Sequence, residues 1–231
     1  MDKRLKIIAS HIENGIGFAD VGTDHGYLPA SMAASGYGGN IIATDINTQP
    51  LQTAVNTAEL AGVRDRIIFL LCDGLEKCQP ELIDTIVIAG MGGDMICRIL
   101  DFAPWCLDSK YKLLLQPMTK AEVVRYWLVY NGFEITCEEL CEEKGSIYQI
   151  IEARFGGYTA LSDAELFTGK FTLCRQPELF MKHTVMLIKN FASAVAGIEQ
   201  SELQSKKTKL PLFREILRGL REMEEQHGNA E

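Results

Sequence analysis

The chain has 231 residues, 47% of them hydrophobic and 23% charged, which is the composition of a globular protein, and no apolar run approaches the ~18 residues of a membrane span. The net charge of −8 lies in residues 1–150, with 12 Lys and Arg against 20 Asp and Glu, and excludes a broad basic surface. Seven scattered cysteines without a C-x-x-C pair predict no disulfide framework, no metal site and a reducing, cytoplasmic location. The first residues form a short amphipathic stretch without a long apolar core, which predicts no signal peptide.

From residue 17 to about 155, short β-rich runs alternate with helical stretches. The first runs are apolar throughout, which is typical of strands covered on both faces. Such alternation predicts an α/β fold with a doubly wound parallel sheet, and the last two runs, joined by a polar turn at Gly145, predict an antiparallel hairpin at one edge. The expected strands are 18–22, 41–45, 67–73, 85–90, 112–117, 133–140 and 147–155, and the expected helices are 27–36, 48–61, 93–103 and 120–131.

The character of the sequence changes after residue 155. Residues 156–177 carry turn signals and little periodicity. Apolar residues then recur at steps of three and four from Met181 to Ile198 and from Phe213 to Met223, which predicts a helical hairpin. We therefore expect a domain over 1–155 and a helical extension over 156–231. The apolar seams could pair within or between chains, so the oligomeric state stays open.

A glycine turn, Gly22-Thr23-Asp24-His25-Gly26, follows the first strand. A dinucleotide-binding turn has a second glycine where this chain has Asp24, whose charge would repel a pyrophosphate, and the Gly-Lys-Ser/Thr of a P-loop is also missing. Carboxylates at such a turn favour a cationic ligand. S-adenosylmethionine, with its ammonium and sulfonium groups, is such a ligand.

The ends of the next strands agree with this ligand. An acid at Asp45 can accept hydrogen bonds from ribose hydroxyls, and Asp73 can accept from an adenine amino group. Glycines after the fourth strand allow close approach of the methionine part. The predicted cofactor-binding residues are Asp20, Gly22, Asp24, Asp45, Ile46, Asp73, Gly74, Ala89, Gly90, Met91 and Gly92.

The segments "DVGTDHGYLP", "AGMGG" and "LLLQP" together resemble the bacterial tRNA adenine N1-methyltransferases that modify adenine 22. The likeness covers nearly the whole chain. It implies a class I methyltransferase domain with a C-terminal helical extension, S-adenosylmethionine as donor and N1 of a tRNA adenine as acceptor. Two positions differ from many members: Met118 stands where they have Asn, and Asp45 stands where some have Glu.

Methylation of N1 places positive charge on the base, so a nearby carboxylate would stabilise the product, and Asp24 is the candidate for this role. His25 could contact the base, help deprotonate the product or cap the following helix. Tyr27 could stack on the base but is expected to pack. An amide can both donate to and accept from an adenine edge, which makes Gln116, followed by Pro117, a candidate base contact. The predicted catalytic residues are Asp24, His25, Gln116 and Pro117.

Other methyltransferase chemistries fit less well. A cytosine-C5 enzyme needs a nucleophilic Cys after Pro, and amino-directed enzymes carry Asn/Asp-Pro-Pro-aromatic at the fifth strand; neither motif occurs. A small-molecule methyltransferase and a non-catalytic protein that binds S-adenosylmethionine or RNA remain alternatives.

A tRNA partner requires basic groups that neutralise phosphates. Three arginines recur at helical spacing in the last helix, and lysines precede it; a second basic cluster lies at 3–6. The alternative is a solvated helix face whose arginines pair with neighbouring glutamates. No DNA or membrane partner is predicted. The predicted tRNA-binding residues are Arg214, Arg218, Arg221, Lys206 and Lys207.

Overall fold

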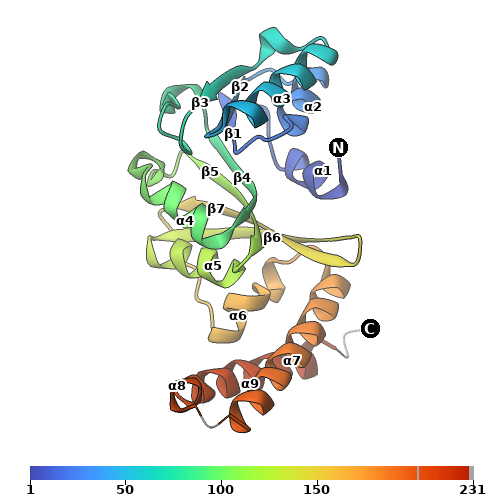
Figure 1. Cartoon of the computed structure of the whole chain (residues 1–231), viewed down its shortest axis with the longest axis vertical. Helices are drawn as coiled ribbons and strands as arrows, with labels where there is room; N and C mark the ends of the chain where they lie inside the picture. Colours follow the sequence, from blue (N-terminus) through green and yellow to red (C-terminus); the bar gives the residue numbers. More distant parts are fainter. Residues whose placement is uncertain (202, 229–231) are drawn as a thin grey trace. The chain divides into compact units, whose positions relative to one another are not determined.

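The computed structural model describes residues 1–201 and 203–228 of the chain. It divides into two compact units, Met1–Thr159 and Ala160–Glu231, both visible in Figure 1. The sequence pattern placed the corresponding change between residues 155 and 156. In the part of the chain that is described, no helix has the length and hydropathy needed to cross a bilayer.

The first unit is built on a seven-stranded sheet with the order β3-β2-β1-β4-β5-β7-β6. Strands β1 to β5 are parallel, and β7 runs antiparallel to both β5 and β6. This arrangement confirms the doubly wound sheet with an antiparallel edge hairpin. The strands are β1 (Gly17–Val21), β2 (Asn40–Asp45), β3 (Ile68–Leu71), β4 (Thr85–Gly92), β5 (Lys112–Thr119), β6 (Phe133–Glu143) and β7 (Ser146–Phe155).

Helices cover both faces of the sheet: α1, α2 and α3 lie on one side in Figure 1, and α4 and α5 lie on the other. Within the sheet, β2 lies next to β1 at one edge of that strand, and β4 lies next to β1 at its other edge. Such a switch point opens a crevice beyond the carboxyl ends of the strands. The helices are α1 (Lys3–Ser10), α2 (Tyr27–Ala34), α3 (Thr48–Leu60), α4 (Gly93–Asp101) and α5 (Ala121–Tyr130), with 3₁₀ turns at Arg64–Arg66, Pro80–Leu82 and Pro104–Cys106.

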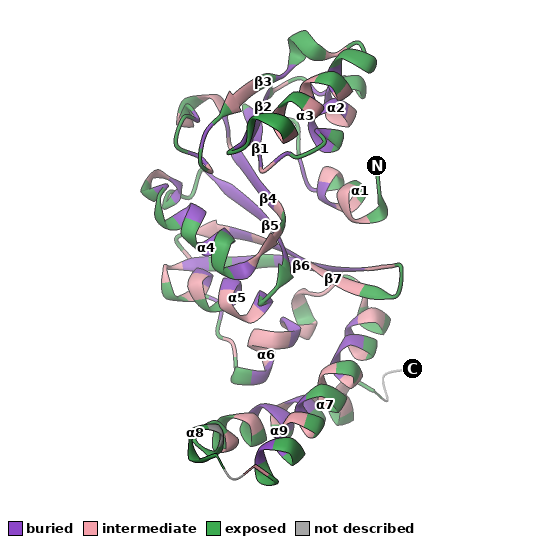
Figure 2. Cartoon of the chain, viewed as in Figure 1, coloured by how far each residue is buried: buried purple, intermediate pink, exposed green. Residues whose placement is uncertain are grey.

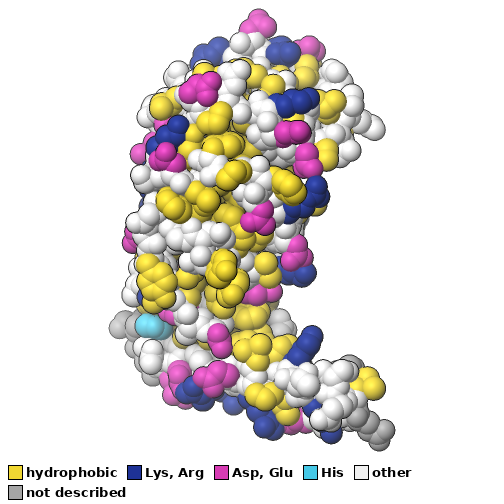
Figure 3. Space-filling model, turned by 90° about the vertical axis from the view of Figure 1, so that its left-hand side faces the viewer, with side chains coloured by type: hydrophobic (Ala, Val, Ile, Leu, Met, Phe, Trp, Pro, Cys, Tyr) yellow, Lys and Arg dark blue, Asp and Glu magenta, His cyan; other side chains and the backbone are white. Residues whose placement is uncertain are grey.

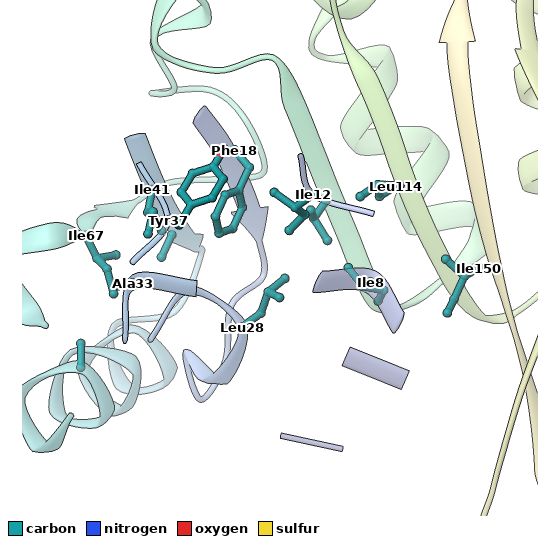
Figure 4. Packing of buried hydrophobic residues seen from close by; sticks show 13 residues of the cluster. Ile8, Ile12, Phe18, Leu28, Ala33, Tyr37, Ile41, Ile67, Leu114 and Ile150 are labelled. Carbon is teal, nitrogen blue, oxygen red and sulfur yellow. The ribbon is translucent and has the colours of Figure 1, made fainter. Parts of the chain in front are cut away.

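The central strands are buried on both faces, as their apolar runs predict, and appear purple in Figure 2. Ile8 of α1 joins the core cluster that contains Phe18 of β1 and Leu114 of β5 (Figure 4). Ile8 is fully buried, and burying a side chain of this size contributes about 1.5–3 kcal/mol. This anchor fixes α1, and with it the first residues of the chain, beside the sheet.

A buried polar triad ties the end of α1 to the edge hairpin. His11 Nδ1 lies 2.8 Å from Glu152 Oε2, and His11 Nε2 lies 3.0 Å from Glu139 Oε1. The hydrogen bond to Glu152 raises the pKa of His11, against the opposing effect of burial, and Glu139 raises it further. Burial raises the pKa of Glu152, but hydrogen bonds from His11 and Thr136 outweigh it and lower that pKa to about 2.

The triad predicts a pH dependence of stability. Because the pKa of His11 is raised from 6.5, its contribution is complete below that pH and is lost as the pH rises through the folded-state pKa. The contribution of Glu152 is complete above 4.5 and is lost as the pH falls toward about 2. The triad should therefore stabilise most between these limits.

Replacing His11 with Gln tests this dependence, because it removes the cationic group that His11 supplies to Glu152 and Glu139. We expect a loss of about 3–5 kcal/mol at about pH 6, shrinking toward alkaline pH, as measured by urea unfolding of the variant and parent across pH. A loss of unfolding free energy in the variant that is the same at acidic and alkaline pH would show that His11 acts by packing alone.

The second unit consists of helices, with α7 packed along α9. Phe191 and Val195 of α7 share one buried cluster with Ile216 and Leu220 of α9, which confirms the helical hairpin expected from the apolar spacing. Helix α6 was not predicted, because six residues are too short to show periodicity. Its capping box, Ser162 with Glu165, was nevertheless present in the sequence. The helices are α6 (Asp163–Thr168), α7 (Pro177–Glu199), α8 (Gln204–Lys207) and α9 (Leu210–His227), with a 3₁₀ turn at Phe171–Leu173.

Candidate functional site

Two adjoining cavities lie beyond the carboxyl ends of β1, β2 and β4. The β2 cavity, of about 240 Å³, is lined by residues that include Asp45, Ile46, Asp73 and Gly74. The α2 cavity, of about 350 Å³, lies among the first residues of the chain, the β1–α2 loop and the end of β4. Gly22 and Met91 line both cavities, so the two spaces meet at these residues.

The β1–α2 loop is held by backbone geometry that its sequence permits. Gly22 has a φ of +70°, and its N–H donates to Thr44 O on β2 at 2.8 Å. Asp24 also has a positive φ, +49°, which Asp and Asn tolerate better than most residues. The Asp24 side chain is 64% exposed and lies 3.5 Å from His25 Nε2. The loop therefore presents a carboxylate and an imidazole to the α2 cavity.

Asp20, at the end of β1, also faces the α2 cavity but is buried. Burial raises its pKa to about 6, a hydrogen bond from Thr23 Oγ1 at 2.7 Å opposes the rise, and the charge of Asp45 adds to it. A buried carboxylate without a cationic neighbour is stabilised by any cation that enters the cavity. This is the electrostatic environment expected for a positively charged ligand.

The β2 cavity contains the two acids expected to hold an adenosine group. Asp45 is buried and accepts from Asn47 N at 2.8 Å and Asp24 N at 3.3 Å, so it couples the two loops. Each carboxylate oxygen can accept two hydrogen bonds and here accepts one, which leaves acceptor capacity for ribose hydroxyls. Asp73 is half exposed and pairs with Arg98 of α4 at 2.9 Å. A further hollow of about 340 Å³ adjoins the cavity at these two residues.

The end of β4 separates the cavities. Gly90 has a φ of +79°, and the pairing with β5 is irregular around Met91. A Cβ at Gly22 would lie 2.0 Å from Met91 Cε, so the methionine side chain packs directly on the loop glycine. The absence of a side chain at position 22 thus makes room for the Met91 side chain at the point where the two cavities meet.

Gln116 and Pro117 are both buried, and they lie behind the α2 cavity, whose lining includes their neighbours Arg4, Gly90 and Met118. Gln116 Oε1 accepts from Arg4 Nη1 at 2.5 Å and from Gly90 N at 3.1 Å, and its Nε2 donates to Pro117 O at 2.9 Å. The amide is therefore engaged within the protein. A direct base contact of Gln116, as expected from the sequence, would require the amide to leave these partners.

Comparison with known proteins identifies the family. A family model described as a methyltransferase domain matches residues 1–151. The tRNA (adenine(22)-N(1))-methyltransferase of Bacillus subtilis (strain 168) is 31% identical over 229 residues, which cover 96% of this chain and 96% of that protein. The chain belongs to the tRNA (adenine(22)-N(1))-methyltransferase family.

Solved structures of this family have the same fold. The crystal structure of the B. subtilis M1A22 tRNA methyltransferase TrmK has a TM-score of 0.85 at 30% identity, over 96% of this chain and 97% of that one. Streptococcus pneumoniae Sp1610 in complex with S-adenosyl-L-methionine has a TM-score of 0.76 at 29% identity, over 94% of this chain and 99% of that one.

In this member of the tRNA (adenine(22)-N(1))-methyltransferase family, two of the five residues predicted to bind tRNA form ion pairs with glutamates. Arg214 contacts Glu199 at 2.6 Å, and Arg218 contacts Glu215 and, at 2.8 Å, Glu222. Arg221 and Lys207 are exposed, and the side chain of Lys206 lies outside the described residues. The two pairs of Arg218 are among those of the alternative interpretation, a solvated helix face, whereas Glu199 was not an expected partner.

Three residues of the site differ from the sequence analysis. Arg4 and Arg98 were not assigned to the cavities, because their contacts join segments far apart in the chain. Tyr27 was expected to pack, but it is 50% exposed, lines the α2 cavity and stacks on His25 at 5.3 Å between ring centroids. Its position at the first turn of α2, beside the loop, explains the exposure.

Proposed function

We propose that this protein transfers a methyl group from S-adenosylmethionine to N1 of an adenine in tRNA, adenine 22 by analogy with its B. subtilis relative, and that it does so in the cytoplasm. The observation that carries the proposal is the pair of carboxylate-lined cavities that meet at Gly22 and Met91. One cavity suits a nucleoside with a cationic sulfonium, and the other suits a base that becomes cationic.

The residues of the β2 cavity fit the donor. Asp45 has acceptor capacity for ribose hydroxyls, and Asp73 has it for an adenine amino group. The Cβ of a side chain at Gly74, with a φ of +56°, would lie 2.9 Å from Ile99, so glycine keeps this wall clear. S-adenosylmethionine, when bound, supplies an activated methyl group.

The residues of the α2 cavity fit the acceptor. N1 of neutral adenine has a lone pair, so the protein needs no base to activate it. The Asp24 carboxylate stabilises the positive charge that develops on the ring, and Asp20 adds negative potential from behind the loop. Tyr27 offers a ring face at the cavity wall. Because N1 lies on the Watson–Crick edge, the target adenosine must be unpaired or extruded.

Incubation with S-adenosylmethionine and purified tRNA, followed by mass spectrometry of the nucleosides and mapping of 1-methyladenosine, tests the proposal. We expect one modified adenine, at position 22, and no product with tRNA that carries guanine there. Methylation of a different base, or S-adenosylmethionine binding without any methylated tRNA, would refute it.

We also propose that the helical hairpin of α7 and α9 contacts the tRNA backbone. Acidic and basic side chains are intermingled on the face of the molecule seen in Figure 3, so local groups must supply the phosphate contacts. Arg221 is exposed, and Arg214 and Arg218 can exchange their glutamate partners for phosphates, since exposed ion pairs contribute only about 0–1 kcal/mol.

Replacing Arg214, Arg218 and Arg221 together with Gln should raise the Michaelis constant for tRNA and leave the affinity for S-adenosylmethionine unchanged. Each lost phosphate contact should reduce the slope of log affinity against log salt by about 0.7–0.9, as measured by filter binding across salt concentrations. An unchanged slope would identify the arginines as a solvated surface and the hairpin as a packing element.

A further inference from the structure

The α2 cavity presents an electrostatic problem for a nucleic-acid substrate. Asp2, Asp20 and Asp24 line it, which suits a cationic product but repels the phosphates attached to the target nucleoside. Among the described residues that line this cavity, Arg4 is the only lysine or arginine. Arg4 is therefore the lining residue whose permanent positive charge can offset the repulsion of a phosphate.

Arg4 is held in a defined position. Its Nη1 donates to Gln116 Oε1 at 2.5 Å and lies 3.6 Å from Met118 Sδ, and its Nη2 lies 3.4 Å from Asp2 Oδ2. The guanidinium also lies 5.7 Å from the ring centroid of Tyr148. The side chain is only 18% exposed, and α1, which carries it, is anchored by Ile8. Little conformational entropy remains to be lost on binding.

These contacts leave hydrogen-bonding capacity for a ligand. A guanidinium has five N–H donors, and the described contacts use both hydrogens of Nη1 and one of Nη2. The Nε hydrogen and one Nη2 hydrogen remain. Arginine donates such pairs to two oxygens of one phosphate, a geometry that lysine cannot reproduce.

We propose that Arg4 binds the backbone phosphate next to the target adenosine and so holds the extruded nucleotide in the α2 cavity. Gln116 is then a positioning residue: its carboxamide oxygen fixes Arg4 and Gly90 together, which sets the distance between the bound phosphate and the end of β4. This inference rests on the proposed function, since it assigns the contact that the same site makes with tRNA.

Arg4→Gln should weaken tRNA binding at least tenfold, as expected for the loss of charge-assisted hydrogen bonds, and leave S-adenosylmethionine affinity unchanged. Arg4→Lys should restore the salt dependence but only part of the affinity. Lys144→Gln is the matched control, because it removes one charge from an exposed turn of the same unit outside both cavities. Intact donor binding in all three variants verifies that they are folded.

A tRNA assembled from synthetic halves, with a neutral methylphosphonate at one phosphate flanking the target adenosine, gives the decisive measurement. At the contacted phosphate, the methylphosphonate should weaken tRNA binding by the parent protein and by Lys144→Gln. The Arg4→Gln variant, which has already lost this contact, should bind the substituted tRNA as well as it binds the unsubstituted tRNA. Equal weakening of the parent and Arg4→Gln at both flanking phosphates would overturn the inference. If the parent methylates adenine 22 in that case, the proposed function stands; if it methylates no tRNA, the proposed function itself fails.

Discussion

Replacement of Asp45 with alanine is expected to lower the affinity for S-adenosylmethionine at least tenfold, because it removes the acceptor for two ribose hydroxyls. A hydrogen bond to a charged group contributes about 1.5–3 kcal/mol, and 1.4 kcal/mol corresponds to tenfold. The substitution also removes the contacts from Asp24 N and Asn47 N, so the β1–α2 loop loses part of its support. Titration calorimetry with S-adenosylmethionine measures the change.

Asp45→Asn separates the loss of the ribose contacts from the loss of loop support. Its amide oxygen can still accept from one backbone N–H but carries no charge. We expect intermediate affinity for this variant and parental affinity for Asp65→Ala, a change at an exposed acid outside the cavities. A dissociation constant unaltered by Asp45→Ala would place the donor outside the β2 cavity.

Replacement of Asp24 with asparagine is expected to slow methyl transfer at least tenfold while changing donor affinity much less. The loss of one charge-assisted interaction with the cationic product, about 1.5–3 kcal/mol, sets this scale. Asparagine is the appropriate substitute because it tolerates the positive φ of 49° at this position, whereas alanine would add backbone strain. Single-turnover measurements at saturating tRNA report the chemical step.

The effect of Asp24→Asn on donor affinity can be compared with its effect on the rate of methyl transfer. A carboxylate that acts on the developing charge affects the transition state more than the bound donor. Equal losses in donor affinity and in the rate of the chemical step would mean that Asp24 only holds the donor. The charge stabilisation would then have to come from Asp20, whose buried carboxyl faces the same cavity.

The fold could be predicted from the sequence because its strands and helices have strong local patterns. The apolar runs of β1 and β2 and the glycine turn at Gly22 determine where the sheet ends and the site begins. The edge hairpin was predicted as well, but not that β7 would insert between β5 and β6, since strand order depends on long-range packing.

Some residues of the candidate site could be predicted from local sequence patterns, and others could not. Acids at strand ends are recognisable because parallel strands bring their carboxyl ends to one edge. Arg4 and Gln116 are 112 positions apart in the sequence, and no local sequence pattern predicts a hydrogen bond between residues so far apart. The sequence predicted that the Gln116 amide contacts the base. In the structure its oxygen accepts hydrogen bonds from Arg4 and Gly90, and a local pattern could not have indicated these partners.

The close packing of Met91 on Gly22 has an evolutionary consequence. A side chain at position 22 would face both an unfavourable φ of +70° and a methyl group 2.0 Å from its Cβ. A Met91 side chain that turned into either of the two cavities that it lines would take space from the donor or the acceptor. The two positions should therefore vary together: relatives with methionine at 91 should retain glycine at 22, and a larger residue at 22 should be tolerated only beside a smaller one at 91.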